Sequence, residues 1–303
     1  MNVFLTGATG YVGSAIAEAL QQAGHRVIGL ARSEAAANLL ATRNIQPVIG
    51  DVRNPAPLAQ QAGEADGVIH AAIIRDIPDL GEVSRIDGRI IEALGDALVG
   101  TDKPLVVSSV SAVLGDTGDQ IVDETALVAT DFGPAIRVMS ENSARKVVER
   151  NVRSIVIRLP AFLHGRGGSV LVPLLIQNAL RSGTSLYVSG GENKTSAVHV
   201  EDAARLYVLA LEKASAGSLY HAVSESSLTI KSVADSIACL TGRPTASVSH
   251  TQALDAIGRF AAMLAINNQL DATKARNELG WQPTGLSLSE DIEHGSYQQF
   301  VTP

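Results

Sequence analysis

The sequence predicts an α/β fold, in which a doubly wound parallel sheet is covered by helices on both faces and is followed by a smaller C-terminal α/β lobe. Two observations support this prediction. Short β-branched apolar runs alternate with longer segments of helical period through the first half of the chain, as parallel strands buried on both faces require. A glycine-rich turn also joins the first run directly to a helical segment. The expected strands are residues 3–5, 27–30, 48–49, 68–69, 105–107 and 155–157.

The turn after the first strand carries Gly7, Gly10 and Gly13 at three-residue spacing. In a dinucleotide-binding Rossmann fold, the first glycine permits the turn, the second lets the backbone approach a pyrophosphate, and the third brings helix and strand together. Free N–H groups at the helix N-terminus then attract the phosphates. Packing alone also produces such turns. We predict that the turn binds a nicotinamide dinucleotide through Thr6, Gly7, Thr9, Gly10, Tyr11, Val12 and Gly13.

The end of the second strand indicates which nicotinamide cofactor is bound. NAD-binding folds carry an acidic residue about twenty residues beyond the glycine turn, where it binds the ribose 2′-hydroxyl. This sequence has Arg32 followed by Ser33 instead. A guanidinium can hold a 2′-phosphate with two hydrogen bonds, and the serine adds a hydroxyl beside it. The alternative is an exposed loop arginine; we predict NADP(H) as the cofactor.

The third to sixth strands each end in a recognisable motif. Pro55 suits the first turn of the helix after the third strand, and Pro104 marks the entry to the fifth. The motifs are Asp51-Val52, His70-Ala71-Ala72, Ser108-Ser109, Arg158-Leu159-Pro160 and, later, His199-Val200-Glu201-Asp202. Together with the glycine turn, and in this order, they resemble the short-chain dehydrogenase/reductase superfamily, in its extended or atypical branch of epimerase/dehydratase-like proteins.

The resemblance implies further cofactor contacts. Asp51 and Val52 are expected to line the adenine pocket, and the small residues after the fourth strand to lie against the riboses. The cofactor-binding residues implied in this way are Asp51, Val52, His70, Ala71, Ala72, Ser108 and Pro160.

The helix after the fifth strand departs from the family pattern. The family uses a serine and a Tyr-x-x-x-Lys pair, whose lysine lowers the pKa of the tyrosine so that the tyrosine can exchange a proton with a carbonyl. Alignment on Ser140 places Arg137 at the tyrosine position and Glu141 at the lysine position, and none of the five tyrosines is followed by lysine four positions later.

Other residues therefore become candidates for the chemistry. Arg137 and Glu141 share a helix face. They form either an ordinary ion pair or an anchor for a substrate oxygen. Ser109 or Ser111 can supply a hydroxyl, although alignment from Gly115 puts Val110 at the usual serine position. His164, in the expected glycine-rich loop 162–168, is a possible proton donor or a solvated bystander. The candidate catalytic residues are Ser109, Ser111, Arg137 and His164.

The remainder of the chain is expected to form the substrate side. We assign residues 1–160 to the NADP-binding domain, with 192–213 returning to it, and 161–303 to a substrate-binding lobe. Leu279-Gly280-Trp281-Gln282-Pro283 resembles a common family ending, and we interpret it as a helix C-cap followed by an aromatic packing anchor. By analogy with the family, the helices expected at 82–99 and 132–150 could form a homodimer interface.

Composition limits the remaining possibilities. The chain of 303 residues has a net charge of −7 and no basic cluster, which argues against a nucleic-acid partner. Its single cysteine, Cys239, excludes an intrachain disulfide and a cysteine-based metal site, and we predict no metal site. No signal peptide and no membrane-spanning run is apparent, so we expect no membrane partner and a cytoplasmic location.

Two functions are compatible with these observations. The first is an NADP(H)-dependent oxidoreductase that acts on a small carbonyl, hydroxyl or imine compound without the usual tyrosine and lysine, with a nicotinamide-assisted epimerase or dehydratase as a variant of it. The second is a non-catalytic NADP(H)-sensing or partner-binding protein. The fold alone does not decide between them.

Overall fold

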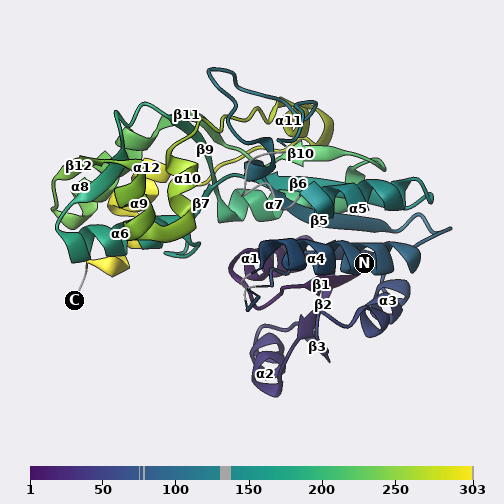
Figure 1. The fold of residues 1–303 in the computed structure, drawn as a ribbon. Coiled ribbons are helices and arrows are strands. Elements are labelled where there is room, and N and C mark those ends of the chain that lie inside the picture. The colour runs from purple at the N-terminus through teal and green to yellow at the C-terminus, as the bar shows by residue number, and fades with distance from the viewer. Residues whose placement is uncertain (75, 78, 130–137, 302–303) are drawn as a thin grey trace.

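Every strand expected in the first half of the sequence is present in the computed structural model, which describes residues 1–74, 76–77, 79–129 and 138–301 (Figure 1). These strands are β1 (Asn2–Thr6), β2 (Arg26–Ala31), β3 (Gln46–Ile49), β4 (Gly67–His70), β5 (Pro104–Val110) and β6 (Arg153–Leu159). The helices between them are α1 (Tyr11–Gln22), α2 (Glu34–Thr42), α3 (Pro55–Glu64), α4 (Leu80–Asp96) and α5 (Val138–Val148).

The large sheet has the order β10-β6-β5-β4-β1-β2-β3, and its strand pairs are all parallel. The chain runs outward from β1 to β3, returns to β4, and then continues in the opposite direction. The order therefore reverses between β1 and β4, and in such sheets the ligand crevice opens at the carboxyl ends of those two strands. The expected doubly wound parallel sheet is confirmed.

Alternation along the strands divides the apolar residues between two cores. Val3 and Leu5 face the core shared with α1, α2 and α7 (Val200–Lys213), whereas Phe4 between them faces α3, α4 and α5. Successive side chains of a strand point to opposite faces, so one short run fills both layers. Because both faces of these strands are buried, the strands appear in the sequence as continuous apolar runs.

The second half contributes to both parts of the molecule. Helix α7 packs on α1, and β10 (Leu219–His221) extends the large sheet beside β6. β10 lies within the range assigned from sequence to the substrate lobe, but outside the segment 192–213 expected to return. The two-domain division itself stays a prediction.

The other elements build a separate core on one side of the large sheet (Figure 1). They are β7 (Phe162–His164), α6 (Leu171–Ser182), β8 (Ser185–Val188), β9 (Lys194–His199), β11 (Glu225–Thr229), α8 (Ile230–Thr241), β12 (Thr245–Val248), α9 (His250–Ile257), α10 (Ala261–Leu264) and α12 (Leu288–His294), with 3-10 helices at Gly258–Phe260 and Ser296–Phe300. β7, β9 and β11 form a small sheet, and β8 pairs with β12.

The expected C-cap near the C-terminus is present. Helix α11 (Thr273–Leu279) ends at Gly280, which has a left-handed φ of 68°. Trp281 is buried, and its Nε1 donates a hydrogen bond of 2.9 Å to the carbonyl of Asp202. The motif therefore fixes α11 against α7. No described helix is long and apolar enough to cross a membrane.

Candidate active site

The glycine turn at the carboxyl end of β1 has the form that a dinucleotide needs. Gly7 has a φ of 79°, and a Cβ added there would lie 2.8 Å from the backbone of Ala71 and Ala72. Gly10 precedes α1 as its N-cap and provides no side-chain cap, so the first-turn N–H groups of that helix remain available to an anion. Residues 71 and 72 thus lie directly against the turn. Their expected contact with the cofactor riboses stays a prediction.

The ends of β2 and β3 form a charged cluster. Arg32 is exposed, and Ser33 serves as the N-cap of α2, where its Oγ accepts a hydrogen bond from the Ala36 N–H. The Asp51 carboxylate accepts hydrogen bonds from Nε and Nη2 of Arg53, which lower the pKa of that carboxyl, and the nearby charge of Arg32 contributes to the same shift. Arg53 was not predicted from sequence, although its position two residues after Asp51 was a usable signal.

A buried hydrogen-bond chain begins at Thr6 in the glycine turn. Thr6 Oγ1 is 2.8 Å from Nδ1 of His70, and Nε2 of His70 is 3.0 Å from Oδ1 of Asp87 on α4. Ser140 on α5 donates its hydroxyl to the other oxygen of Asp87. The carboxylate is acceptor only, so Nε2 of His70 carries the proton and Nδ1 accepts from Thr6. The hydrogen-bond chain ties the glycine turn to α4 and α5.

The serines after β5 have different hydrogen-bond partners. Ser109 donates its hydroxyl to Glu141 at 2.6 Å, so its single proton is already engaged. Ser108 Oγ accepts from the Tyr207 hydroxyl at 2.7 Å, which leaves its own proton to donate. Ser111 is buried, and its hydroxyl has no hydrogen-bond partner among the described residues. By this count, Ser108 and Ser111 are the better hydroxyl donors of the three.

Glu141, at the family's lysine position, belongs to a buried ion pair. Its carboxylate accepts hydrogen bonds from Nε and Nη2 of Arg158 on β6, at 2.8 and 2.7 Å. Both side chains are at least 98% buried. Glu141 was expected to pair with Arg137, which lies outside the described residues, so that pairing stays untested. The described partners of Glu141 are Ser109 and Arg158.

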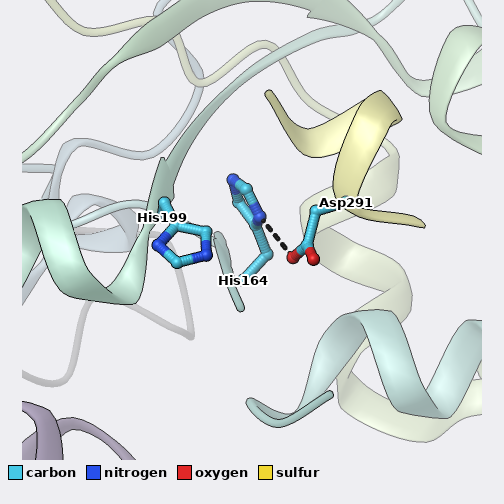
Figure 2. Close-up of side chains that lie close together, drawn as sticks. All are labelled: His164, His199 and Asp291. Atoms are coloured by element: carbon cyan, nitrogen blue, oxygen red, sulfur yellow. Dashed lines mark hydrogen bonds and ion pairs between the residues drawn. The ribbon is translucent and has the colours of Figure 1, made fainter. Parts of the chain in front are cut away.

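His164 has a different setting from the one expected. The sequence indicated a glycine-rich loop from residue 162, but the structure places His164 at the end of β7, where it is completely buried. The loop prediction was wrong for residues 162–164 because they pair in parallel with β9, a partner far along the chain. Nδ1 of His164 is 2.9 Å from Oδ2 of Asp291, and the His199 ring lies edge-on to the His164 ring (Figure 2).

The glycine-rich residues that follow His164 cover the start of α1. The Tyr11 hydroxyl donates to the carbonyl of Gly165 at 2.9 Å, and a Cβ at Gly168 would lie 2.3 Å from the Tyr11 ring. Burial raises the pKa of Tyr11 well above its ordinary value. This shift disfavours the ionised phenolate form of Tyr11. Arg166 fixes the same segment through ion pairs with Glu18 and Glu201.

These positions bring together the predicted cofactor residues more closely than the predicted catalytic ones. The turn residues, Ala71 and Ala72 lie together at the carboxyl ends of β1 and β4, and β2 is the next strand of the sheet beside β1. Ser109 and His164 belong to separate hydrogen-bond networks, one centred on Glu141 and the other on Asp291. A groove of about 750 Å³, bordered by Glu124, Lys274 and Glu278 among others, contains none of the predicted cofactor residues.

Comparison with known proteins agrees with this arrangement. Residues 3–224 match the model of the NAD dependent epimerase/dehydratase family. The chain is 38% identical over 297 residues to the uncharacterized protein C2A9.02 of Schizosaccharomyces pombe, covering 98% of this chain and 100% of the relative. It is 29% identical to a Stigmatella aurantiaca ketoreductase of 4-hydroxy-2-methyl-3-oxo-4-farnesyl-3,4-dihydroquinoline-1-oxide, over 73% of this chain and 67% of that protein.

Solved structures show the same fold. The dTDP-glucose 4,6-dehydratase DesIV of Streptomyces venezuelae, determined with NAD bound, superposes with a TM-score of 0.80 at 21% identity, over 99% of this chain and 97% of that chain.

Proposed function

The chain belongs to the NAD dependent epimerase/dehydratase family and is an oxidoreductase-type enzyme that uses a nicotinamide cofactor, and we propose that this cofactor is NADP(H) and the substrate a small carbonyl, hydroxyl or imine compound. The proposal rests on two features that occur together. The helix that follows the glycine turn has an uncapped N-terminus, and Arg32 lies exposed at the end of β2.

The residues of the turn fit a dinucleotide. Gly10 presents no side chain toward the open end of α1, and Gly7 and Gly13 hold strand and helix too close for any Cβ between them. A 2′-phosphate at the end of β2 would meet the exposed guanidinium of Arg32, with Arg53 as a second cation nearby. An NAD ribose would find no acidic partner at residue 32.

The protein's part in the reaction is positioning and proton supply. When bound, the cofactor would supply a hydride to the substrate. A carbonyl that accepts it develops negative charge on oxygen, which a hydroxyl donor stabilises. We assign this donor to Ser111 or Ser108, because each retains a hydroxyl proton that no described side chain accepts. Arg137 remains a candidate from sequence as an anchor for the same oxygen.

Oxidation of NADPH with a panel of small aldehydes, ketones and imines tests the proposal. We expect turnover with NADPH on at least one compound class and weaker turnover with NADH. Tight NADPH binding without turnover on any compound would favour the sensing role. The buried Glu141 at the family's lysine position also supports that role. Failure to bind either cofactor would contradict both.

A further inference from the structure

We propose that His164, His199 and Asp291 form a binding site for a divalent first-row transition cation, with Zn²⁺ the best match. Each residue presents one potential ligand atom, and these atoms all lie within 4.8 Å of one another. Two imidazoles and one carboxylate are a donor set that suits zinc, whereas magnesium and calcium prefer oxygen donors alone. The sequence predicted no metal site because that reasoning rested on cysteine.

The three ligands come from three separate elements. His164 ends β7, His199 ends β9 and is the N-cap of α7, and Asp291 lies in α12 (Figure 2). The register of the small sheet sets His164 directly opposite His199. The site is therefore created by tertiary packing, and a bound cation would join the small sheet and α7 to the core around α12.

Asp291 is already oriented as a ligand. One of its oxygens accepts hydrogen bonds of 2.8 Å from the backbone N–H and the hydroxyl of Ser296, while the other faces His164 at 2.9 Å. Hydrogen bonds of this kind hold a ligating carboxylate in a fixed direction. His164 and Asp291 are almost fully buried, and Nε2 of His164 has no partner among the described residues.

Closing the site requires a small movement of His199. Ligand atoms at about 2.1 Å from tetrahedral zinc are roughly 3.4 Å apart, so a separation of up to 4.8 Å must shrink by as much as about 1.4 Å. Nδ1 of His199 accepts a long hydrogen bond of 3.3 Å from the Glu201 N–H, which is lost when the ring proton moves from Nε2 to Nδ1 so that Nε2 can bind the cation. His199 is half-buried and can adjust. Gly165 leaves its Nε2 uncovered, since a Cβ there would lie 2.7 Å away.

The test is a zinc titration of the full chain after chelator treatment, with a chromophoric chelator as competitor. We expect one Zn²⁺ per chain with a Kd below about 1 µM. His199→Ala should raise the Kd at least about tenfold, and Asp291→Asn, which preserves shape, should do the same. His199 is the first choice for substitution because it is half-buried, whereas truncating buried His164 could prevent folding.

Two variants control for surface binding. His294 is 77% exposed, and Cys239 is an exposed free thiol, so His294→Ala and Cys239→Ser should bind zinc as the parent does. Zinc should also raise the Tm of the parent and of both controls, and it should raise the Tm of His199→Ala by less.

Several outcomes would overturn the site. These are no binding by the parent at about 100 µM zinc, an unchanged Kd in both ligand variants, or loss of binding in a control variant. The titration contains no nicotinamide cofactor and no substrate, so its result is independent of the proposed function.

Discussion

Arg32 is the residue on which the proposed preference for NADP(H) rests. We expect NADPH to bind at least about tenfold more tightly than NADH, about 1.4 kcal/mol for one charge-assisted contact. Arg32→Ala should remove this preference and leave NADH affinity nearly unchanged. Calorimetric titration of both cofactors measures it, with Arg243→Ala, an exposed arginine after α8, as the matched control. A parallel loss of both affinities would mean that Arg32 is structural.

Glu141 is a second residue with a measurable role, because it neutralises a guanidinium that is completely buried. Glu141→Gln should lower the free energy of unfolding by about 3–5 kcal/mol, since Arg158 is left as an uncompensated buried charge. Urea unfolding gives this value. The double variant Glu141→Leu, Arg158→Met removes both charges and should recover much of the loss. A single variant within about 1 kcal/mol of the parent would contradict this account of the pair.

His221 gives the stability of the protein a pH dependence. Burial, followed by the charge of Arg158, lowers the pKa of His221 to about 3. Its Nδ1–H donates to the carbonyl of Asp271, and Nη1 of Arg158 lies 3.4 Å from its Nε2. The folded protein therefore holds His221 in its neutral form. The nearby Asp123, Glu124 and Asp271 do not reverse the lowering of its pKa.

The sign of this effect follows from proton binding. Unfolded histidine, with a pKa of about 6.5, takes up a proton before the folded one does. The contribution is therefore complete above about pH 6.5 and is lost as pH falls toward the folded pKa, by about 1.4 kcal/mol per pH unit. Urea unfolding at pH 7, 6 and 5 should show a shallower decline for His221→Asn than for the parent. Equal slopes would assign the decline to other groups.

At the scale of elements, the contact between β1 and α1 is decided by backbone proximity. A Cβ at Gly13 would lie 2.0 Å from the Gly7 carbonyl oxygen, which is backbone and cannot rotate away. Gly13→Ala should therefore cost about 1–3 kcal/mol of stability and weaken NADPH binding more than tenfold.

Gly63→Ala in α3 is the matched control, because the atom nearest to a Cβ added there is 3.9 Å away. That variant should be neutral or slightly stabilised, by up to about 1 kcal/mol. Similar results for the two variants, in unfolding and cofactor titrations, would refute the close-contact argument.

At the scale of the whole molecule, the expected dimer can be examined through α4 and α5. The apolar residues of α4 that suggested a partner surface are buried within one chain, including Ile86, Ile90 and Leu94. The outward face carries charges instead, with ion pairs between Lys146 and Glu92 and between Arg150 and Asp96.

A dimer through this face would be polar and sensitive to salt. Light scattering at low ionic strength should give twice the chain mass of 31.6 kDa, and the mass should fall toward that of one chain at about 1 M salt, where screening is strong. Charge reversal of Lys146 should have the same effect at low salt. A clean monomer under all conditions would refute the dimer, and a salt-independent dimer would place its interface elsewhere.

Local pattern was sufficient for much of the molecule. The strands of the first half, the glycine turn and the C-cap at Gly280 with its Trp281 anchor were all predicted. These features depend on side-chain period, on glycine's freedom at positive φ and on contacts within a few residues. The absence of a Tyr-x-x-x-Lys pair could also be seen in the sequence, because both residues would lie four positions apart on one helix.

The sequence by itself therefore determined the first six strands of the large sheet, the helices between them and the glycine turn after β1. Only the tertiary structure decided which partners the polar side chains have: Arg158 and Ser109 for Glu141, Asp87 for His70, and Asp291 for His164. It also decided that β10 pairs with β6, and that His164 lies in a buried strand. The physical reason is that these partners are far apart along the chain. Whether a polar group meets water, a carboxylate or a guanidinium depends on how whole elements pack, and no local period records that.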